Sequence, residues 1–166
     1  MPLVLSGSNG IGVNGTNWAL APTSSGLSLT PNVPAFWARG SGNLVFSSPT
    51  LARKLILDTA FTNNGNHYNT SLSRFTAPVT GRYWLFMSAL TNTATSTGPA
   101  LILFRNGVGL REVAINYGDR FYVNFSGGAV VEANAGDFFE VFVENYNNTS
   151  FTIELGRCYW MGYLIG

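Results

Sequence analysis

Residues 57–86 read LDTAFTNNGNHYNTSLSRFTAPVTGRYWLF. An apolar run leads into the turn-rich cluster Asn63-Asn64-Gly65-Asn66, and aromatic residues and a glycine follow it at Tyr68, Phe75, Gly81 and Tyr83. Asn and Gly favour tight turns, whereas closely spaced aromatic residues favour strands. The stretch therefore predicts a β-rich domain with short connections.

The composition restricts the class of protein. The chain has 166 residues, which suits one domain, and only 10% of them are charged, against a usual value of about 25%. A surface so poor in charge is expected to associate with a partner. The net charge of +1 provides no basic patch, so nucleic-acid binding is not expected, and neither is a membrane span because no run of 18 apolar residues occurs. Cys158 is the single cysteine, which predicts a buried and inert thiol.

Residues 1–33 differ in composition from the rest of the chain. They are rich in Gly, Ser, Asn, Thr and Pro, with isolated apolar residues that include Leu3, Val4, Leu5, Ile11, Trp18 and Leu20. This pattern predicts an extended arm that pairs or packs against a partner, with Trp18 as its main anchor. The alternative is a loose tail.

From Pro34 onward the hydrophobic period is two, which is typical of strands. Strands are predicted at 35–39, 43–46, 54–61, 75–77, 82–91, 99–105, 110–116, 121–125, 129–132, 138–146, 151–155 and 158–165. Short strands with regular turns, among them Asn106-Gly107, favour a two-sheet sandwich. Several strands are apolar on both faces, so one face is expected to pack against other subunits.

The signature residues stand at spacings that resemble the C1q/tumour necrosis factor-like globular head. Asn63, Tyr68, Phe75, Gly81 and Tyr83 carry the resemblance, together with Asn106-Gly107, Ala135-Gly136-Asp137 and the ending Gly162-Tyr163-Leu164-Ile165. Leu57, Leu85 and Met87 depart from the family's aromatic positions but keep apolar volume. The resemblance covers residues 34–166 and implies a ten-stranded jelly roll that forms a homotrimer. From the apolar strands, we expect the trimer interface at Tyr83, Phe86, Tyr159, Trp160 and Tyr163.

The arm is similar to the start of tailed-bacteriophage virion proteins, through the opening LVLSGSNGI at residues 3–11. This resemblance implies a capsid cement or decoration protein, made in the host cytoplasm and located on the capsid surface of the virion. Its arm would bind the major capsid protein or another virion protein through added strands, with contacts at Leu3, Val4, Leu5, Ile11, Trp18 and Leu20. The first residues are too short and uncharged for a secretory signal peptide.

Two other binding roles remain open at this stage. A tail-fibre tip would bind a host glycan or protein through loops 92–98 and 146–150, which are rich in Thr, Ser and Asn. A secreted C1q-like ligand is disfavoured by the missing signal peptide.

Catalytic, cofactor and metal sites are not expected. His67 is the sole histidine, and Ser71, Ser73 and Asp58 are partners only by residue type. Glu140 and Glu144 are expected about 13 Å apart on the solvent face of one strand, which exceeds glycosidase spacing. Asp119 and Asp137 lie in turns but form no acidic cluster for calcium. The sequence thus favours a non-enzymatic binding protein.

Overall fold

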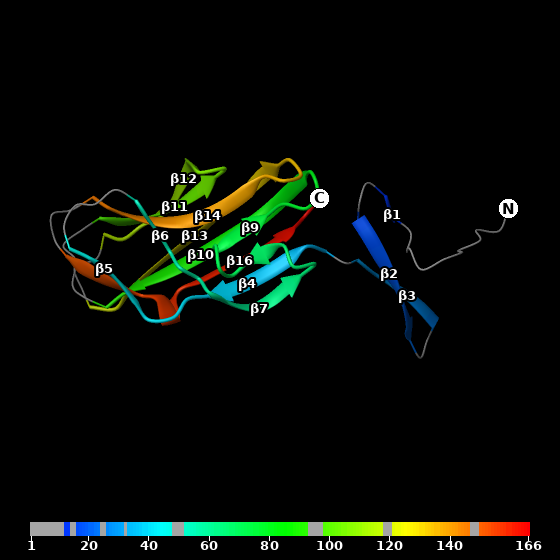
Figure 1. The fold of residues 1–166 in the computed structure, drawn as a ribbon, viewed down its shortest axis with the longest axis horizontal. Helices are drawn as coiled ribbons and strands as arrows, with labels where there is room; N and C mark the ends of the chain where they lie inside the picture. Colours follow the sequence, from blue (N-terminus) through cyan, green and yellow to red (C-terminus); the bar gives the residue numbers. More distant parts are fainter. Residues whose placement is uncertain are drawn as a thin grey trace.

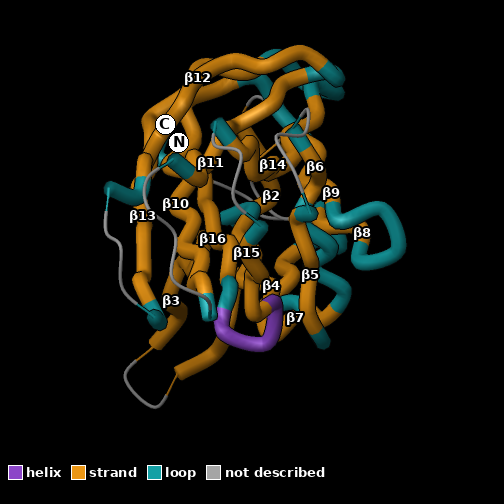
Figure 2. The backbone as a smooth tube through the Cα atoms, turned by 90° about the vertical axis from the view of Figure 1, so that its left-hand side faces the viewer, coloured by secondary structure: helices purple, strands orange, loops and turns teal. Residues whose placement is uncertain are grey.

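The computed structural model describes residues 12–13, 16–23, 26–31, 33–47, 52–92, 98–117, 121–146 and 150–166. Within them the chain is almost entirely β-structure, in three separate antiparallel sheets (Figure 1). Two of these sheets stack as a sandwich that begins at Ala35, and the third is a small sheet in the N-terminal region. The described residues of this sandwich contain one short 3-10 helix, η1 (Leu155–Arg157), drawn in purple between β15 and β16 in Figure 2.

The first sandwich sheet has the strand order β5-β15-β10-β16-β4-β7, and β13 pairs with β10. Its strands are β4 (Ala35–Arg39), β5 (Asn43–Phe46), β7 (Thr59–Asn64), β10 (Gly81–Thr91), β13 (Val123–Ala133), β15 (Phe151–Glu154) and β16 (Tyr159–Leu164). β10 pairs with three of them, β13, β15 and β16. The last strand, β16, lies between β10 and the first strand of the sandwich, β4, so the sheet brings both ends of the sandwich into its centre.

The second sandwich sheet has the order β12-β11-β14-β9-β8, and β6 pairs with β14. Its strands are β6 (Arg53–Lys54), β8 (Tyr68–Asn69), β9 (Arg74–Thr76), β11 (Pro99–Arg105), β12 (Val108–Ile115) and β14 (Phe138–Asn145). The hairpin between β11 and β12 turns at Asn106 and Gly107, whose φ angles are 52° and 80°. The turn predicted at Asn106-Gly107 is confirmed, and positive φ at both positions is typical of type I′.

The core between the sheets is rich in aromatic residues. Phe36 stacks on Tyr68 and on Phe75, with ring centroids 5.0 and 4.7 Å apart, and meets Trp160 edge-on at 4.8 Å. These rings come from β4, β8, β9 and β16, so they join both sheets. Burial of each ring contributes on the order of 2–3 kcal/mol, which makes this cluster a major source of stability.

The N-terminal sheet contains β1 (Gly12–Val13), β2 (Thr16–Thr23) and β3 (Gly26–Pro31) in that order. Trp18 and Leu20 lie on β2, opposite Pro31 and Leu29 of β3. Leu3, Val4, Leu5 and Ile11 lie outside the described residues. Attachment through residues 1–33 stays a prediction.

Two predicted strand assignments change. Residues 54–61 do not form one strand, because Leu55 and Leu57 enter the core without extending β6, and the Leu57 amide donates to Ser73 Oγ instead of a neighbouring strand. Residues 121–125 and 129–132 were predicted as two strands, yet β13 is one strand that pairs with β10 in an unbroken register from Val123 to Ala133.

Candidate functional site

The outer face of the first sheet carries a group of surface aromatic residues on its two central strands. Along β10 the residues Tyr83, Leu85 and Met87 point into the core, and Trp84 and Phe86 point outward. Across the sheet Trp84 is opposite Tyr163, and Phe86 is opposite Met161. Cross-strand partners share a face of a sheet, so aromatic and sulfur-containing side chains form adjacent rows.

The rows continue onto β4 and β7 at the edge of the sheet. Met161 is opposite Trp37, whose ring lies 4.8 Å from that of Phe61. The Arg39 guanidinium lies 5.1 Å from the Phe61 ring centroid. Trp37 is 44% exposed and Phe61 is 50% exposed. We define the aromatic face as the outward residues Trp37, Phe61, Trp84, Phe86, Tyr159, Met161 and Tyr163.

The structure corrects two of the predicted interface residues. Tyr83 and Trp160 are fully buried inside one chain, where the Tyr83 hydroxyl donates to Val79 O at 2.7 Å. They cannot contact another copy because the period-two alternation turns them inward. Phe86, Tyr159 and Tyr163 lie on the outer side, and their role in a trimer stays a prediction.

The sequence analysis missed four residues of the aromatic face, namely Trp37, Phe61, Trp84 and Met161. The signal that could have found three of them is the parity of each strand. Once Trp160 is assigned to the core, Met161 must point outward, and Trp37 and Trp84 then follow from strand alternation. Phe61 carries no such signal because β4 and β7 change register between Trp37 and Ala38.

A second apolar surface lies where the edge strands β12 and β13 face each other. Val108, Leu110 and Val130 are exposed there. Leu110 and Val130 line a cavity of about 370 Å³, with Arg105 and Arg111 also in its wall. We call this surface, defined by Val108, Leu110 and Val130, the apolar edge.

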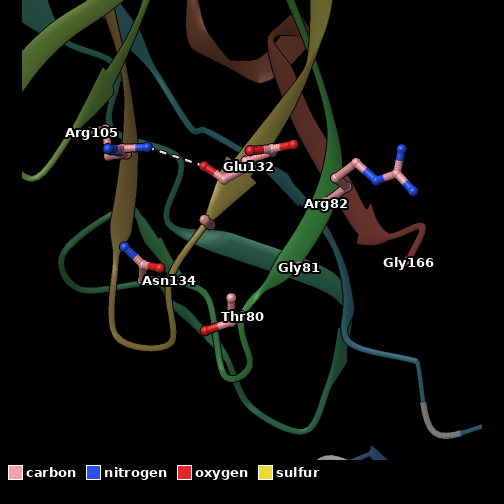
Figure 3. Close-up of a pocket in the computed structure, with 8 residues that line it drawn as sticks. Thr80, Gly81, Arg82, Arg105, Glu132, Asn134 and Gly166 are labelled. Atoms are coloured by element: carbon pink, nitrogen blue, oxygen red, sulfur yellow. Dashed lines mark hydrogen bonds between the residues drawn. The ribbon is translucent and has the colours of Figure 1, made fainter.

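Another cavity, of about 410 Å³, lies at the end of the sandwich where β10 begins (Figure 3). Arg105 Nη1 donates to Glu132 O at 3.1 Å, and Arg105 Nε lies 3.9 Å from an Asp137 carboxylate oxygen. The Arg82 side chain points away from Arg105 in this view. The hydrogen bond from Asn106, aided by the Asn134 amide and by Arg105, lowers the pKa of Asp137. The guanidinium of Arg105 therefore already interacts with groups of the same chain.

The comparisons with known proteins follow the fold. A C1q domain model matches residues 35–165. This chain belongs to the C1q domain family. The C1q assignment covers both sandwich sheets and excludes only the N-terminal sheet among the described strands.

Solved structures support the same fold for this C1q domain. The globular domain of zebrafish complement 1qA is 18% identical, with a TM-score of 0.54, and the match covers 80% of this chain and 98% of that one. Murine APRIL is 14% identical, with a TM-score of 0.60, covering 80% and 99%. The Eiger TNF of S. frugiperda is 12% identical, with a TM-score of 0.56, covering 81% and 93%. No curated protein sequence matches.

The residues that carried the C1q resemblance hold the architecture. Asn63 Oδ1 accepts from the Tyr68 amide at 2.9 Å, and Asn63 Nδ2 donates to Tyr68 O at 2.8 Å. The Tyr68 hydroxyl donates to Leu57 O at 2.7 Å, and burial raises the pKa of Tyr68. Gly81 begins β10 where an added Cβ would meet the Leu164 side chain at 2.8 Å. These contacts are structural.

The C1q domain brings together no catalytic constellation among its described residues. Burial lowers the pKa of His67, which packs beside Gly65. Ser73 Oγ accepts from the Leu57 amide, and Asp58 accepts from Ser41 and Thr59. Three or more His, Cys, Asp or Glu residues placed to hold a metal do not occur in the described ranges. Asp119 lies outside them.

The charges on the second sheet also differ from expectation. Glu140 does not face solvent but is buried, and it accepts from Lys54 and Arg74. The reason is that Lys54 on β6 and Arg74 on β9 both contact the carboxylate.

In the described part of the chain, no helix is long and apolar enough to cross a membrane.

Proposed function

We propose that this C1q domain is a non-enzymatic structural protein of a bacteriophage virion. It forms a homotrimer and decorates the capsid, to which the arm at residues 1–33 attaches it. The observation that carries the proposal is the aromatic face. Only 10% of the residues are charged, and Trp37 and Phe61 are exposed on one sheet, so this face is suited to contact another protein. Exposed aromatic patches of this kind mark protein interfaces.

The partner that fits the aromatic face is a second copy of this chain. C1q/TNF-like domains commonly form homotrimers. The apolar edge at Val108, Leu110 and Val130 adjoins the aromatic face, because Val130 of β13 is the cross-strand partner of Trp84 of β10. Contact between two different surfaces of one chain is heterologous, and such contacts form a ring when the rotation between successive copies closes. Each copy would place its apolar edge against the aromatic face of the next.

Attachment through the arm rests on the opening LVLSGSNGI and on the apolar residues that follow it. An arm of this composition gains affinity by adding strands to a partner and by burying a large anchor such as Trp18. Three arms on one trimer bind with avidity, so each single contact need not be strong. Three arms that bind together suit attachment to the repeating surface of a capsid.

The experiment compares the full-length protein with residues 34–166 on capsids that lack the protein, and measures the mass of both in solution. We expect both to be trimers and only the full-length protein to bind capsids. The Tyr117→Ala variant of the full-length protein is the control that should bind as well as the original. A truncated trimer that binds host cells, while neither form binds capsids, would establish the tail-fibre role instead.

A further inference from the structure

The edge strands β12 and β13 come into backbone contact at Gly127. A Cβ added to Gly127 would lie 2.0 Å from Val113 O, so the two backbones are in contact there. On one side of this contact lies the apolar edge. On the other side a cavity of about 490 Å³ opens between residues 114–117 and 123–126. We call this second space the polar groove.

The position of the polar groove suits recognition. β10 begins at Gly81, near Gly166 and the Pro34 end of the domain, and it ends at Thr91 opposite Val123. Ten residue steps at about 3.3 Å each place the groove roughly 30 Å from the end where the arm joins. A trimer held by its arms would therefore present this groove outward.

The described walls of the polar groove carry amides and hydroxyls but no charged side chain. Asn116, Asn124 and Ser126 line it together with Tyr117, and none of the lining residues that the structure describes is Asp, Glu, Lys, Arg or His. Asn124 Nδ2 donates to Ser88 Oγ at 2.8 Å, which fixes the orientation of the Asn124 side chain. A neutral wall of this kind favours a ligand with many hydroxyl groups and no net charge, because an ion would lose hydration without gaining a counter-charge.

Exposed aromatic residues lie in or directly before the two segments that line the groove. Tyr117 is 74% exposed, and Phe121 and Tyr122 are exposed 66% and 61%. Tyr122 has a φ of 58°, a left-handed conformation that costs free energy for a bulky side chain. Strain and exposed rings at one site are retained more readily where they serve binding. Aromatic rings offer apolar faces to the CH groups of a sugar, and tyrosine adds a hydroxyl.

An extended peptide fits this place poorly. The contact between Gly127 and Val113 closes the space after a few residues of each strand, so no continuous edge is available for strand addition. The volume suits a small ligand or the end of a chain. We propose that the polar groove binds the terminal units of an uncharged carbohydrate, with Tyr117 stacking on a sugar ring and with Asn124 and Ser126 bonding its hydroxyls.

The test uses the full-length protein on an array of uncharged gluco-, galacto- and manno-oligosaccharides, followed by calorimetric titration with the strongest binder. Tyr117→Ala is expected to weaken binding about tenfold, and Asn124→Ala to do the same, through lost stacking and hydrogen bonding. Tyr117→Phe should retain most of the affinity because it keeps the ring. Tyr146→Ala is the matched control, since Tyr146 is exposed outside the groove lining, and its affinity should change less than about twofold.

The mass and the melting temperature of each variant are measured to check that the assembly is intact. The proposal is overturned if no uncharged oligosaccharide binds at millimolar concentration, or if only charged glycans or peptides bind. It is equally overturned if Tyr117→Ala and Asn124→Ala bind as tightly as the original protein. Failure here leaves capsid attachment through the arm unaffected, because that is read from capsid binding alone.

Discussion

Lys54 Nζ lies 2.8 Å from Glu140 Oε1, and Arg74 Nη2 reaches the same oxygen at 3.0 Å. Glu140 is only 5% exposed, so its carboxylate has given up most of its hydration. The Arg74 guanidinium also lies 3.8 Å from the Phe138 ring centroid. Two cations on one buried carboxylate offset the desolvation of that charge and connect β6, β9 and β14.

Removal of this carboxylate should therefore be costly. We expect Glu140→Ala to lower the free energy of unfolding by about 3 kcal/mol, the lower part of the range for breaking a buried ion pair, because Lys54 and Arg74 can still reach water. Urea unfolding measures the change. Glu132→Ala removes an exposed carboxylate and should change the same quantity by less than about 0.5 kcal/mol. Equal effects of the two substitutions would contradict the role assigned to Glu140.

Asn63 makes a second contact whose loss can be predicted. Its side-chain amide pairs with both backbone groups of Tyr68, and this pairing positions the Tyr68 ring against Phe36. We expect Asn63→Ala to reduce the free energy of unfolding by about 2 kcal/mol, because a half-buried amide and carbonyl lose their partners. The control is Asn64→Ala, since the Asn64 side-chain amide donates a long and weak hydrogen bond to Val33 O, at 3.5 Å. Thermal unfolding of both variants distinguishes the two asparagines.

Much of the strand pattern was predictable from the sequence. β4, β5 and β11 have the predicted bounds, because each is short and is flanked by Gly, Ser, Asn or Pro. The β11–β12 turn was predictable because Asn106-Gly107 favours positive φ at both positions. The two-sheet sandwich and the C1q family followed from these local signals and from the signature around Asn63.

The failures have a tertiary cause. Leu55 and Leu57 alternate like strand residues, but the Leu57 amide bonds a side chain, Ser73 Oγ, which no periodicity reveals. The predicted strands stopped on either side of Gly127, whereas this glycine lies within β13 and allows its close contact with β12. The register between strands decides which face of β10 and β16 is buried. It therefore also decides that Trp160 is buried and that Tyr159 is not. The polar groove joins residues on two edge strands that do not pair, so no sequence pattern indicated it.

The contact between Gly127 and Val113 gives a prediction about packing. An alanine at position 127 would place its Cβ against the backbone of β12, which cannot rotate away. We expect Gly127→Ala to destabilise the fold by about 3 kcal/mol. Gly156→Ala is the matched control because a Cβ added there would meet nothing within 4 Å, and it should be close to neutral. Urea midpoints provide the measurement, and a stable Gly127→Ala variant would show that the two edge strands can separate.

Cys158 predicts how stability depends on pH. Burial raises the pKa of its thiol from 9.0 to about 11, opposed by a backbone hydrogen bond and aided by Glu154. Because the folded pKa exceeds the unfolded one, the thiol's stabilising contribution is complete below pH 9 and is lost as pH rises toward 11. We expect a loss of about 1 kcal/mol between about pH 9 and pH 10.

The comparison for that pH profile is Cys158→Ala, which should remove about half of the fall between about pH 9 and pH 10. Tyr68 and Tyr83 also contribute in this interval, because burial raises their pKa above the ordinary value of 10.0 and each then loses roughly 0.3 kcal/mol of stabilisation by pH 10. Unfolding free energies at several pH values provide the test. A profile that is identical in the two proteins would mean that the thiol does not carry the dependence.

The aromatic face predicts a separation between assembly and folding. Trp37 is exposed in the single chain, so Trp37→Asp should leave the monomer fold intact while placing a charge in the proposed contact. We expect sedimentation to show a monomer in place of a trimer, and the melting temperature to lose its dependence on protein concentration. Trp160→Ala should act differently, because it creates a core cavity and lowers the stability of the chain by about 3–5 kcal/mol. Leu72→Asp, at an exposed turn between β8 and β9, is the surface control and should remain trimeric. A charge buried in a subunit contact destabilises the assembly far more than a charge on a free surface does. If Trp37→Asp and Leu72→Asp both have the same mass as the original protein, the aromatic face is therefore not the assembly surface.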